Sequence, residues 1–302
     1  MFSRLRYGLT MTRIAVLTPD PADPSYDGQW QGVLERLAAA LATSGITVEP
    51  SPWTAHVDDA AALTGYPLVL PLIVWGYHRD HPRWVQACET WAVAGVRMLN
   101  PPSVIGWNSD KAYLGRLADK GVAIPQTVWV DGVSQADVDA AFDRFGSEVV
   151  IVKPRVSGGA WKTLRLSRGE RLAEAPEGPA MIQPYLPSIE TEGETSLLFF
   201  GGKLSHVVNK RPVAGEFRIQ VQFGGQYVAL PEPPAGALAL AKQTLAAIDE
   251  DLLYARIDMA PGPDGGWLLM EAELIEPDFY LGSASEGGKR FAEAVRNRLD
   301  AG

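Results

Sequence analysis

Three carboxylates near the end of the chain have the spacing of a cation-binding site. Glu271 and Glu273 lie two residues apart in LLMEAEL, so on a β-strand both side chains point to the same face of the sheet. Asp258 lies in YARIDMAP, which the turn GPDGG joins to that strand, and it can face both glutamates. Three carboxylates packed together repel one another unless a cation neutralises them, and hard oxygen ligands suit Mg²⁺. A solvated sheet face is the alternative, but the apolar residues around the three acids favour the metal.

A glycine-containing loop is a candidate phosphate site. In VVIVKPRVSGGAWKT (149–163), a buried strand leads into Lys153 and then into Gly158 and Gly159. The glycines allow backbone N–H groups to approach a polyphosphate, and Lys153 supplies a fixed positive charge. The spacing is not that of a P-loop. Taken alone, the segment is equally compatible with an ordinary β-turn beside a solvated lysine.

The segment MIQPYLPSIETEGETSLLFF has groups that suit a nucleoside. Gln183, Tyr185 and Leu186 follow a strand and offer donors and acceptors to an adenine edge. Glu190 or Glu194 can accept hydrogen bonds from ribose hydroxyls. A simple crossover between two strands is the alternative for this segment.

Four cations from separate segments can serve a transferred phosphoryl group: Lys111, Lys210, Arg218 and Arg256. Such a group needs positive charge from several directions, and arginine gives a fixed bidentate geometry. Taken singly, each is more readily explained as a surface charge.

An aromatic, histidine-containing loop, WGYHRDHPRW, follows the strongest apolar run of the first hundred residues. His78 and His81 have helical spacing, but no third ligand accompanies them, so a zinc site is not expected. A loop beyond the carboxyl end of a parallel strand is instead expected to contact substrate.

The elements that position these residues begin with a parallel α/β region over 11–105. We expect a helix that ends near Gly45, a helix over 82–94, and strands at 13–18, 46–50, 68–75 and 96–99. Paired prolines predict a crossing loop over 100–110. After it, Asn108, Ser109 and Asp110 are N-cap candidates for a helix over 111–120.

From residue 125 the pattern changes to α+β. We expect a helix near 135–145 among strands at 127–130, 148–153, 163–166 and 180–183. Antiparallel strands then follow at 195–200, 203–210, 216–223 and 226–230, with hairpin turns at Gly201-Gly202 and Gly224-Gly225. A helix over 235–249, strands at 254–260 and 266–274, and a helix over 286–299 complete the prediction.

The composition is that of a globular protein, with 302 residues, 46% hydrophobic and 21% charged. A net charge of −9, without a basic run, argues against nucleic-acid and membrane partners. Cys88 is the single cysteine, which excludes an intramolecular disulfide. Residues 1–10 lack the apolar core of a signal peptide and are predicted to be a disordered extension, with Met11 a candidate start. We therefore expect a cytoplasmic protein that acts on small molecules.

Together, and in this order, the segments resemble the ATP-grasp superfamily of carboxylate–amine ligases. ARIDM and LLMEAEL resemble the metal-binding strands of D-alanine–D-alanine ligases, and MIQPYLPSIETEGETSLLFF is similar to the hinge of bacterial glutathione synthetases. The strings VWGYH, NSDKAYL, VKPRVSGG, NKRP, GEFRIQ and ELIEPDFYL resemble the cycloserine-biosynthesis type, which has O-ureido-D-serine cyclo-ligase activity.

The resemblance implies an ATP-grasp fold with ATP in the cleft between two lobes. Its parts are an N-terminal α/β domain (11–105), a central lid lobe with the glycine loop (106–185) and a C-terminal lobe with the metal site (186–302). The implied ATP-binding residues are Lys111, Lys153, Ser157, Gly158, Gly159, Gln183, Tyr185, Leu186, Glu190, Glu194 and Lys210. The implied ligands of one or two Mg²⁺ ions are Asp258, Glu271 and Glu273. The implied catalytic residues are Lys153, Arg218 and Arg256, and the implied substrate contacts are Trp75, Tyr77, His78, Glu276 and Asp278.

The chain departs from the superfamily pattern at two places. Glu273 stands where many members have asparagine, and a second Mg²⁺ would offset the added charge. IEPDFYL stands where those ligases have a Pro-Gly turn and a small hydroxyl residue for a substrate carboxylate. Here Glu276 and Asp278 would repel a carboxylate and attract an ammonium group.

We therefore expect a Mg-ATP-dependent ligase that forms a C–N bond through an acyl phosphate on an amino-acid-like carboxylate. The bond is intramolecular if the chain acts like an O-ureido-D-serine cyclo-ligase. The alternatives are an intermolecular amino-acid or peptide ligase and an ATP-binding regulatory protein. A dinucleotide oxidoreductase is disfavoured, because proline-rich LTPDPADP follows the first strand where glycines are needed. The expected partner is a small-molecule substrate, and the protein is expected to be a monomer or a homodimer.

Overall fold

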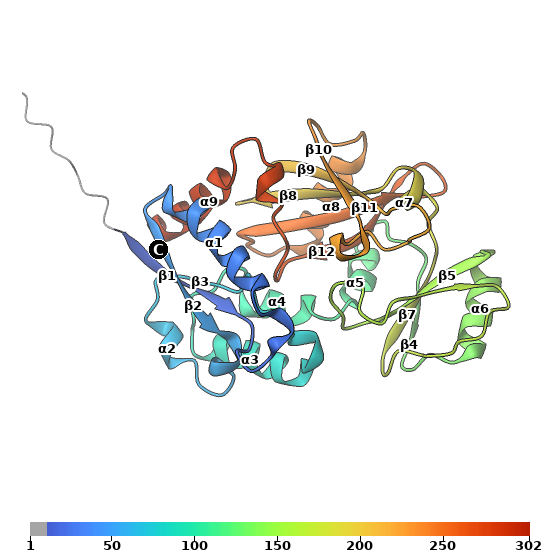
Figure 1. Cartoon of the computed structure of the whole chain (residues 1–302), viewed down its shortest axis with the longest axis horizontal. Coiled ribbons are helices and arrows are strands. Elements are labelled where there is room, and N and C mark those ends of the chain that lie inside the picture. Colours follow the sequence, from blue (N-terminus) through green and yellow to red (C-terminus); the bar gives the residue numbers. More distant parts are fainter. Residues whose placement is uncertain (1–10) are drawn as a thin grey trace, which may run out of the picture.

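The computed structural model describes residues 11–302, so the extension predicted over residues 1–10 lies outside the described residues. The described chain forms a parallel three-stranded sheet, an antiparallel four-stranded sheet and an antiparallel five-stranded sheet. Figure 1 shows the parallel sheet and the four-stranded sheet at opposite ends, with the five-stranded sheet above and between them. The predicted fold class, an α/β region followed by two α+β regions, is confirmed.

The central strand of the parallel sheet is buried on both faces because helices cover both sides. Its strands, in the order β2-β1-β3, are β1 (Thr12–Thr18), β2 (Ile46–Pro52) and β3 (Val69–Leu70). The helices are α1 (Gln29–Ala42), α2 (Ala61–Thr64) and α3 (His81–Val93), with 3-10 turns at Pro24–Tyr26, Trp53–His56 and Tyr77–Arg79. Ile14 and Val16 pack against α1, whereas Ala15 and Leu17 pack against α3, as alternation along a strand requires.

Two strands predicted in this region are shorter than expected. β3 ends at Leu70 because the next residue, Pro71, has no N–H group to donate to a ladder. The residues after it are buried but irregular, and they carry the chain to the WGYH loop. The strand predicted at 96–99 is a single parallel bridge between Val69 and Met98.

The crossing loop predicted over 100–110 is wrong, because α4 (Pro102–Asn108) occupies most of it. Pro101 is the N-cap and Pro102 the first helical residue, a position at which a missing N–H group costs nothing. The helix predicted next is confirmed as α5 (Tyr113–Asp119). Its N-cap position is Ala112, whose N–H donates to the Asp110 carboxylate at 2.8 Å.

The four-stranded sheet is antiparallel, in the order β4-β7-β5-β6, and carries one helix. Its elements are β4 (Val128–Val130), β5 (Val149–Pro154), β6 (Leu164–Ser167), β7 (Ala180–Pro184) and α6 (Gln135–Phe145). A capping box between Ser134 and Asp137 starts α6, and Val138 and Phe142 pack it onto the sheet.

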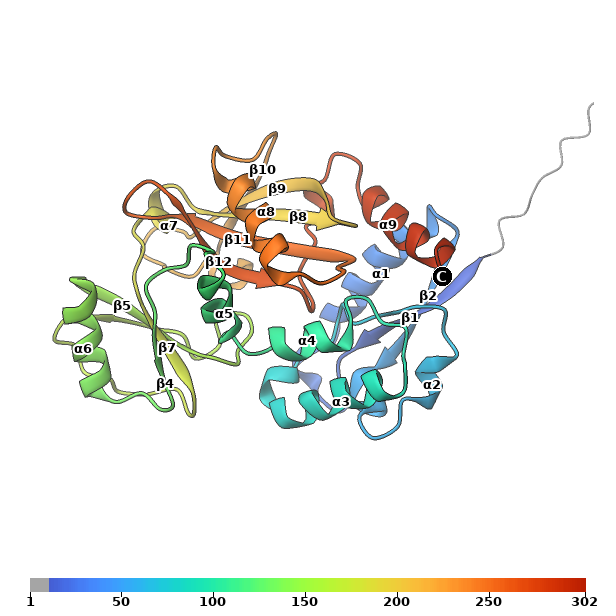
Figure 2. The same ribbon diagram turned by 180° about the vertical axis from the view of Figure 1, so that it is seen from behind.

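The five-stranded sheet forms the middle of the molecule, in the order β10-β9-β8-β11-β12. Its strands are β8 (Glu194–Phe200), β9 (Lys203–Arg211), β10 (Gln226–Leu230), β11 (Tyr254–Pro261) and β12 (Trp267–Glu273). The accompanying helices are α7 (Ser188–Thr191), α8 (Ala237–Ile248) and α9 (Lys289–Asp300), with 3-10 turns at Val221–Phe223 and Leu281–Ser283. α5 and α8 pack on one face, as Figure 2 shows from behind.

The hairpin at Gly201-Gly202 is confirmed, but the strand predicted at 216–223 and the turn at Gly224-Gly225 are wrong. β9 pairs directly with β10, and the residues between them form a loop. This loop folds back on itself so tightly that a Cβ at Gly225 would lie 1.8 Å from the carbonyl oxygen of Ile219. The residues EFRIQVQF, although polar and apolar side chains alternate along them, therefore do not form a β-strand.

One buried side chain fastens the parallel region to the five-stranded sheet. Asn100 is 0% exposed, and its Nδ2 donates to the carbonyl oxygens of Tyr254 (2.9 Å) and Leu274 (2.8 Å). Its Oδ1 accepts from the Leu253 N–H at 2.8 Å. In the described residues, no helix is long and apolar enough to cross a membrane.

We predict that Asn100→Ala lowers the free energy of unfolding by about 3 kcal/mol or more, because it leaves several buried backbone groups without hydrogen-bond partners at once. Urea denaturation followed by circular dichroism measures this. Asn297→Ala, on the exposed face of α9, is the matched control and is expected to change stability by about 0.5 kcal/mol or less. Equal effects of the two substitutions would contradict the role of Asn100.

Candidate functional site

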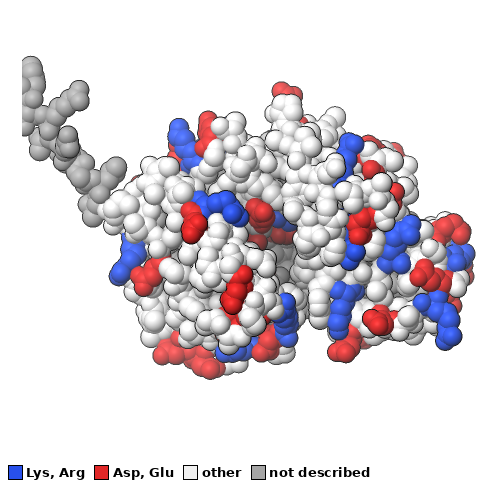
Figure 3. All heavy atoms as spheres, in the orientation of Figure 1, with Lys and Arg blue, Asp and Glu red and all other residues white. Residues whose placement is uncertain are grey.

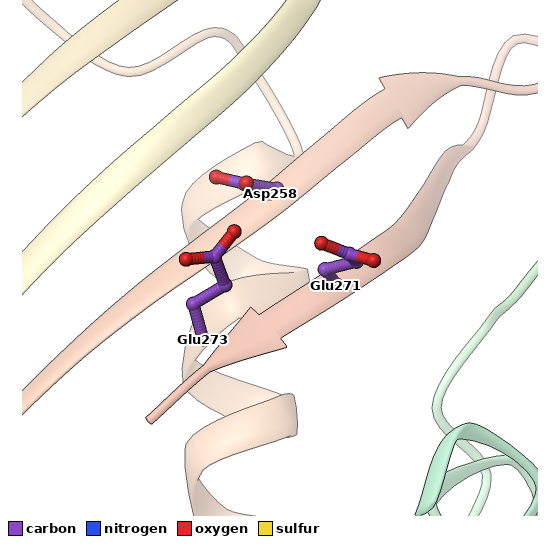
Figure 4. Close-up of side chains that lie close together, drawn as sticks. All are labelled: Asp258, Glu271 and Glu273. Carbon is purple, nitrogen blue, oxygen red and sulfur yellow. The ribbon is translucent and has the colours of Figure 1, made fainter. Parts of the chain in front are cut away.

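The three predicted metal ligands lie together on neighbouring antiparallel strands. Asp258 on β11 is paired with Glu271 on β12, and Glu273 follows on the same face of β12. One carboxylate oxygen from each lies within 4.8 Å of the others (Figure 4). Strand alternation, as read from the sequence, is enough to produce this arrangement.

Buried cations hold Asp258 in place. Lys210 on β9 is 2% exposed and lies between Glu194 Oε1 (2.7 Å) and Asp258 Oδ2 (3.1 Å). Arg256 contacts Asp258 at 3.0 Å and also pairs with Glu273. The Ser196 hydroxyl donates to Asp258 Oδ1 at 2.6 Å. Both oxygens of Asp258 therefore have protein partners.

The charges around the cluster give its carboxylates different pKa values. Burial would raise the pKa of Asp258, but Arg256 and Lys210 outweigh it and lower that pKa to about 2. Burial raises the pKa of Glu273 to about 7, because the charges of Asp258 and Glu271 add to it and Arg256 offsets only part. Burial would also raise the pKa of Glu271, but Lys111 and Lys153 lower it.

The donor set fits Mg²⁺. Glu271 and Glu273 each use Oε1 in an ion pair, with Lys111 and Arg256 respectively, which leaves the second oxygen of each for an ion. Hard carboxylate oxygens on a rigid pair of strands suit this cation. Asp258, whose oxygens are already engaged, can reach an ion only in addition to its protein partners.

Lys111 connects the acidic cluster to the glycine loop. Its Nζ lies 3.2 Å from Glu271 Oε1, and it donates to the backbone oxygen and hydroxyl of Ser157 at 3.1 and 3.2 Å. Lys153, at the end of β5, is half-buried, and burial lowers its pKa. Next to Ser157, the glycine at position 158 leaves room for His78 of the parallel region. A Cβ atom at position 158 would lie 3.4 Å from His78 Nδ1.

The predicted nucleoside segment is placed at the junction of the two antiparallel sheets. Leu186 packs with Ala260 and Met270, and Ile189 and Leu268 add to this apolar cluster. An apolar cluster of this kind can form one wall of a base-binding pocket.

Several polar groups of that segment are already paired. Gln183 is buried and donates to Thr127 Oγ1 at 3.0 Å, and the N–H of Tyr185 donates to the Val149 carbonyl at 3.0 Å. The Tyr185 hydroxyl donates to Glu190, and Glu194 forms an ion pair with Lys210. The side chains are thus fixed by one another.

Arg218 is not brought into the cluster. It lies in the loop between β9 and β10, where it pairs with Glu216 at 2.7 Å and stacks over the Phe223 ring at 3.6 Å. The sequence spacing gave no sign of this local pair, and a role for Arg218 at the phosphoryl group stays a prediction.

The predicted substrate residues differ in how they are placed. Tyr77 is buried and Trp75 half-buried, and Trp75 packs against Tyr26 at 5.6 Å. Asp278 is exposed, and its carboxylate accepts from the Tyr280 N–H at 2.8 Å. Burial raises the pKa of Glu276 well above its usual range, and the charge of Glu273 adds to this.

His78 faces the glycine loop from the parallel region. Its Nδ1 is buried and has no hydrogen-bond partner among the described residues, and its ring lies 5.6 Å from that of Trp161. Burial, with Arg79 and Lys111 nearby, lowers its pKa to about 4, so the ring is neutral at pH 7.

A cavity of about 290 Å³ opens between the parallel region and the four-stranded lobe. Its lining includes His78, His81, Arg155, Trp161 and Lys162. Arg155 is held by Asp110 at 2.5 Å, and His81 by Ser109 at 2.8 Å. Sequence reasoning missed Arg155 and Trp161, although both lie inside VKPRVSGGAW, beside the residues it did select.

Two antiparallel α+β regions meet at a cluster of acids with Lys111, Lys210 and Arg256, next to a parallel α/β region. This combination defines an ATP-grasp ligase. The family described as "D-cycloserine synthetase DcsG, N-terminal domain" matches residues 14–100. The cycloserine biosynthesis protein DcsG of Streptomyces lavendulae is 30% identical over 87% of this chain and 92% of its own. The chain therefore belongs to the DcsG family, and the predicted resemblance is confirmed.

Other relatives agree with this assignment. A glutathione synthetase of Parasynechococcus marenigrum is 32% identical over 80% of this chain and 76% of its own. The crystal structure of D-cycloserine synthetase DcsG superposes with a TM-score of 0.77 at 27% identity, over 95% of this chain and 99% of that one. D-alanine–D-alanine ligase from Bacillus anthracis superposes with a TM-score of 0.70 at 16% identity, over 96% and 100%, which is a likeness of fold.

We predict that Mg²⁺ stabilises the protein more at pH 8 than at pH 6. Without a cation, the pKa of Glu273 is about 7 in the folded protein, against 4.5 ordinarily. Folding therefore favours the protonated form of Glu273, and the stability that this form contributes at low pH is lost as the pH rises through 7. A bound cation reverses this loss, because it requires the ionised form. Melting temperatures with MgCl₂ and with EDTA across this range measure the difference, and Glu273→Gln is expected to abolish its pH dependence. An equal Mg²⁺ effect at pH 6 and pH 8 would be evidence against the site.

Proposed function

We propose that the protein uses Mg-ATP to activate an amino-acid-like carboxylate as an acyl phosphate, which a nitrogen nucleophile then converts into a C–N bond. The observation that carries this proposal is the convergence of Asp258, Glu271 and Glu273 with Lys210, Arg256 and Lys111. Nucleotide binding alone does not need three acids, two lysines and an arginine gathered at one point. A reaction that moves charge between oxygens does.

The nucleotide is proposed to lie between the two antiparallel sheets. Leu186 and its apolar neighbours face the adenine, with Gln183, Tyr185, Glu190 and Glu194 around the nucleoside. Lys111, Lys153 and Lys210 hold the phosphates together with the backbone of the glycine loop. Glu271 and Glu273, with Asp258, would hold one or two Mg²⁺ ions, which neutralise phosphate charge when bound.

In the first step the substrate carboxylate attacks the γ-phosphorus, and ADP leaves. Arg256 is fixed by Asp258 and Glu273. It therefore stabilises negative charge on the oxygens of the transferred phosphoryl group without having to reorganise. Lys153 approaches from the opposite lobe, and Arg218 can join only after it leaves Glu216. In the second step the nitrogen attacks the acyl carbon and phosphate leaves.

The glycine loop is proposed to exclude water from the acyl phosphate. Lys111 already ties Ser157 of this loop to Glu271, so closure of the loop and assembly of the acidic cluster share one cation. In this proposal residues 106–185 move as the lid, against the parts formed by 11–105 and 186–302.

We further propose that the bond is intramolecular, as expected of an O-ureido-D-serine cyclo-ligase, since the chain is similar along its length to D-cycloserine synthetase DcsG. Similarity to glutathione synthetases supports the second candidate, an intermolecular amino-acid ligase.

We expect ADP and phosphate release when Mg-ATP is supplied with O-ureido-D-serine alone, and a cyclic product lighter than the substrate by one water, or by one water and the carbamoyl group (HNCO) where that group is lost as well. The assay uses amino acids singly and in pairs, with mass spectrometry of the products. Release only with pairs would establish the intermolecular alternative. No release with any substrate, while ATP still raises the melting temperature, would leave a nucleotide-binding protein and refute the ligase reaction.

We predict that Glu271→Gln reduces the rate of ADP formation at limiting Mg²⁺ about 100-fold, since a lost ligand and its pairing with Lys111 together cost about 3 kcal/mol. A Mg²⁺ titration of the steady-state rate measures this. Glu232→Gln makes the same chemical change at an exposed position and serves as the control. A near-wild-type rate for Glu271→Gln would show that the assignment of the metal site is wrong.

A further inference from the structure

Tyr280, in the segment that follows β12, has an unusual backbone conformation. Its φ is 47°, in the left-handed region that bulky side chains rarely adopt. Among the non-glycine residues of 11–302 with a positive φ, it is the only aromatic one. A strained residue of this kind persists where its surroundings hold it, and such residues gather at functional sites.

Hydrogen bonds hold Tyr280 in this conformation from both sides. Its N–H donates to Asp278 Oδ1 and its carbonyl oxygen accepts from the Ser283 N–H, both at 2.8 Å. The preceding carbonyl, of Phe279, lies 2.8 Å from His206 Nε2 on β9, and this nitrogen must donate because a carbonyl only accepts. The backbone at Tyr280 is therefore fixed relative to the five-stranded sheet.

The ring of Tyr280 lies against Arg256. The guanidinium carbon Cζ of Arg256 is 5.3 Å from the ring centroid, which is within the range of a cation–π contact. The ring of Tyr227 packs edge-on against Tyr280, with 5.3 Å between the centroids and 79° between the planes. Tyr227 on β10 is paired with Lys210 on β9, so both side chains lie on the same face of the sheet. Tyr227 thus supports the Tyr280 ring beside the buried cations.

The protein uses all but one of the N–H groups of Arg256. Its Nε and Nη2 donate to Asp258, and Nη2 also pairs with Glu273. Its Nη1 donates to the Asp278 carbonyl oxygen at 3.3 Å, and among the described residues the second N–H of Nη1 has no partner. This N–H is the donor that remains for a phosphoryl oxygen, so the orientation of the guanidinium plane decides whether it can be used.

The cluster is accessible from solvent although Arg256 is buried. The side chains of Glu271 and Glu273 are 31% and 30% exposed, against 8% for Arg256. Figure 3 shows acidic side chains in the hollow in the middle of one face of the molecule. Glu273 holds Arg256 less tightly when it also binds a cation, because its charge is then shared between the two. The Tyr280 ring is neutral and keeps its contact with the guanidinium.

We propose that Tyr280 is a positioning residue: its ring, supported by Tyr227, orients the guanidinium of Arg256 so that the free N–H of Nη1 faces the transferred phosphoryl group. This inference rests on the proposed ligase function and adds a residue to the machinery of the same site. The contact stabilises the transition state, in which charge builds up on the phosphoryl oxygens, and contributes little to the binding of the nucleotide.

A mimic of the transition state tests this proposal without a known substrate. Calorimetry measures the affinity for Mg-ADP alone and for Mg-ADP with aluminium fluoride, which imitates the phosphoryl group during transfer. We expect Tyr280→Leu to lose about ten-fold of the gain in affinity that aluminium fluoride gives the wild type, and to keep its affinity for Mg-ADP within about two-fold. Tyr280→Phe keeps the ring and is expected to behave like the wild type.

Steady-state kinetics gives a second measurement. With a substrate that supports turnover, Tyr280→Leu is expected to lower kcat about ten-fold with little change in the KM for ATP, because Arg256 is then misplaced only where charge develops. Tyr227→Leu removes the supporting ring and leaves Tyr280 in place, and it is expected to lower kcat about three-fold.

Tyr66→Leu is the matched control, because it removes a ring from beside an arginine in the parallel region. Cζ of Arg13 lies 6.0 Å from the centroid of the Tyr66 ring. The kcat, the KM and the gain from aluminium fluoride are expected to stay at the wild-type values in this variant. A merely structural role of Tyr280 would instead make Tyr280→Leu lose melting temperature and Mg-ADP affinity together.

The inference is overturned if Tyr280→Leu keeps the wild-type gain from aluminium fluoride, or if Tyr280→Phe loses as much of it as Tyr280→Leu does. A joint loss of stability and Mg-ADP affinity would overturn it as well. Failure of the proposed function has a different signature, since the wild type itself would then gain nothing from aluminium fluoride and would release no ADP with any substrate. The inference would fall with it.

Discussion

The buried charge of Asp258 constrains the five-stranded sheet, because a carboxylate removed from water must be paired where it lies. Its partners come from three strands: Lys210 on β9, Ser196 on β8 and Arg256 on β11 itself. A shift of one residue in any of these strands would turn a partner to the opposite face. The charged partners of Asp258 can face it only in this register of the sheet. The register of β12 is set in the same way, because Asp258 is paired with Glu271.

Among the polar groups that join the other two regions to this sheet, two make several bonds each. Asn100 joins the parallel region to the backbone of β11 and to Leu274, just beyond β12. Lys111 joins the four-stranded lobe, through Ser157, to Glu271. The first contact is fully buried and fixed, whereas the second is part of the site and involves only one cation.

Much of this arrangement is predictable from the sequence because it depends on alternation along strands and on the order of elements. The pairing of Asp258 with Glu271 follows from two short strands joined by GPDGG. α4 was missed because paired prolines disfavour regular structure except at the first turn of a helix, which is where Pro101 and Pro102 lie. The strand predicted at 216–223 failed because alternation does not reveal that the chain folds back at Gly225. The pairing of Arg218 with Glu216 and the ring contact of Tyr280 depend on side-chain positions that spacing does not encode.

The position of Asn100 has a consequence for biosynthesis. Its side chain bonds to backbone groups that follow 154 and 174 residues later, so these bonds cannot form until Tyr254 and Leu274 have left the ribosome. α9, the last helix, likewise supplies Phe291 and Val295 to the core that covers the first strand. The parallel region, which is translated before α9, exposes part of its apolar surface until α9 has been made. The parallel region can therefore complete its packing only after β12 and α9 have been synthesised.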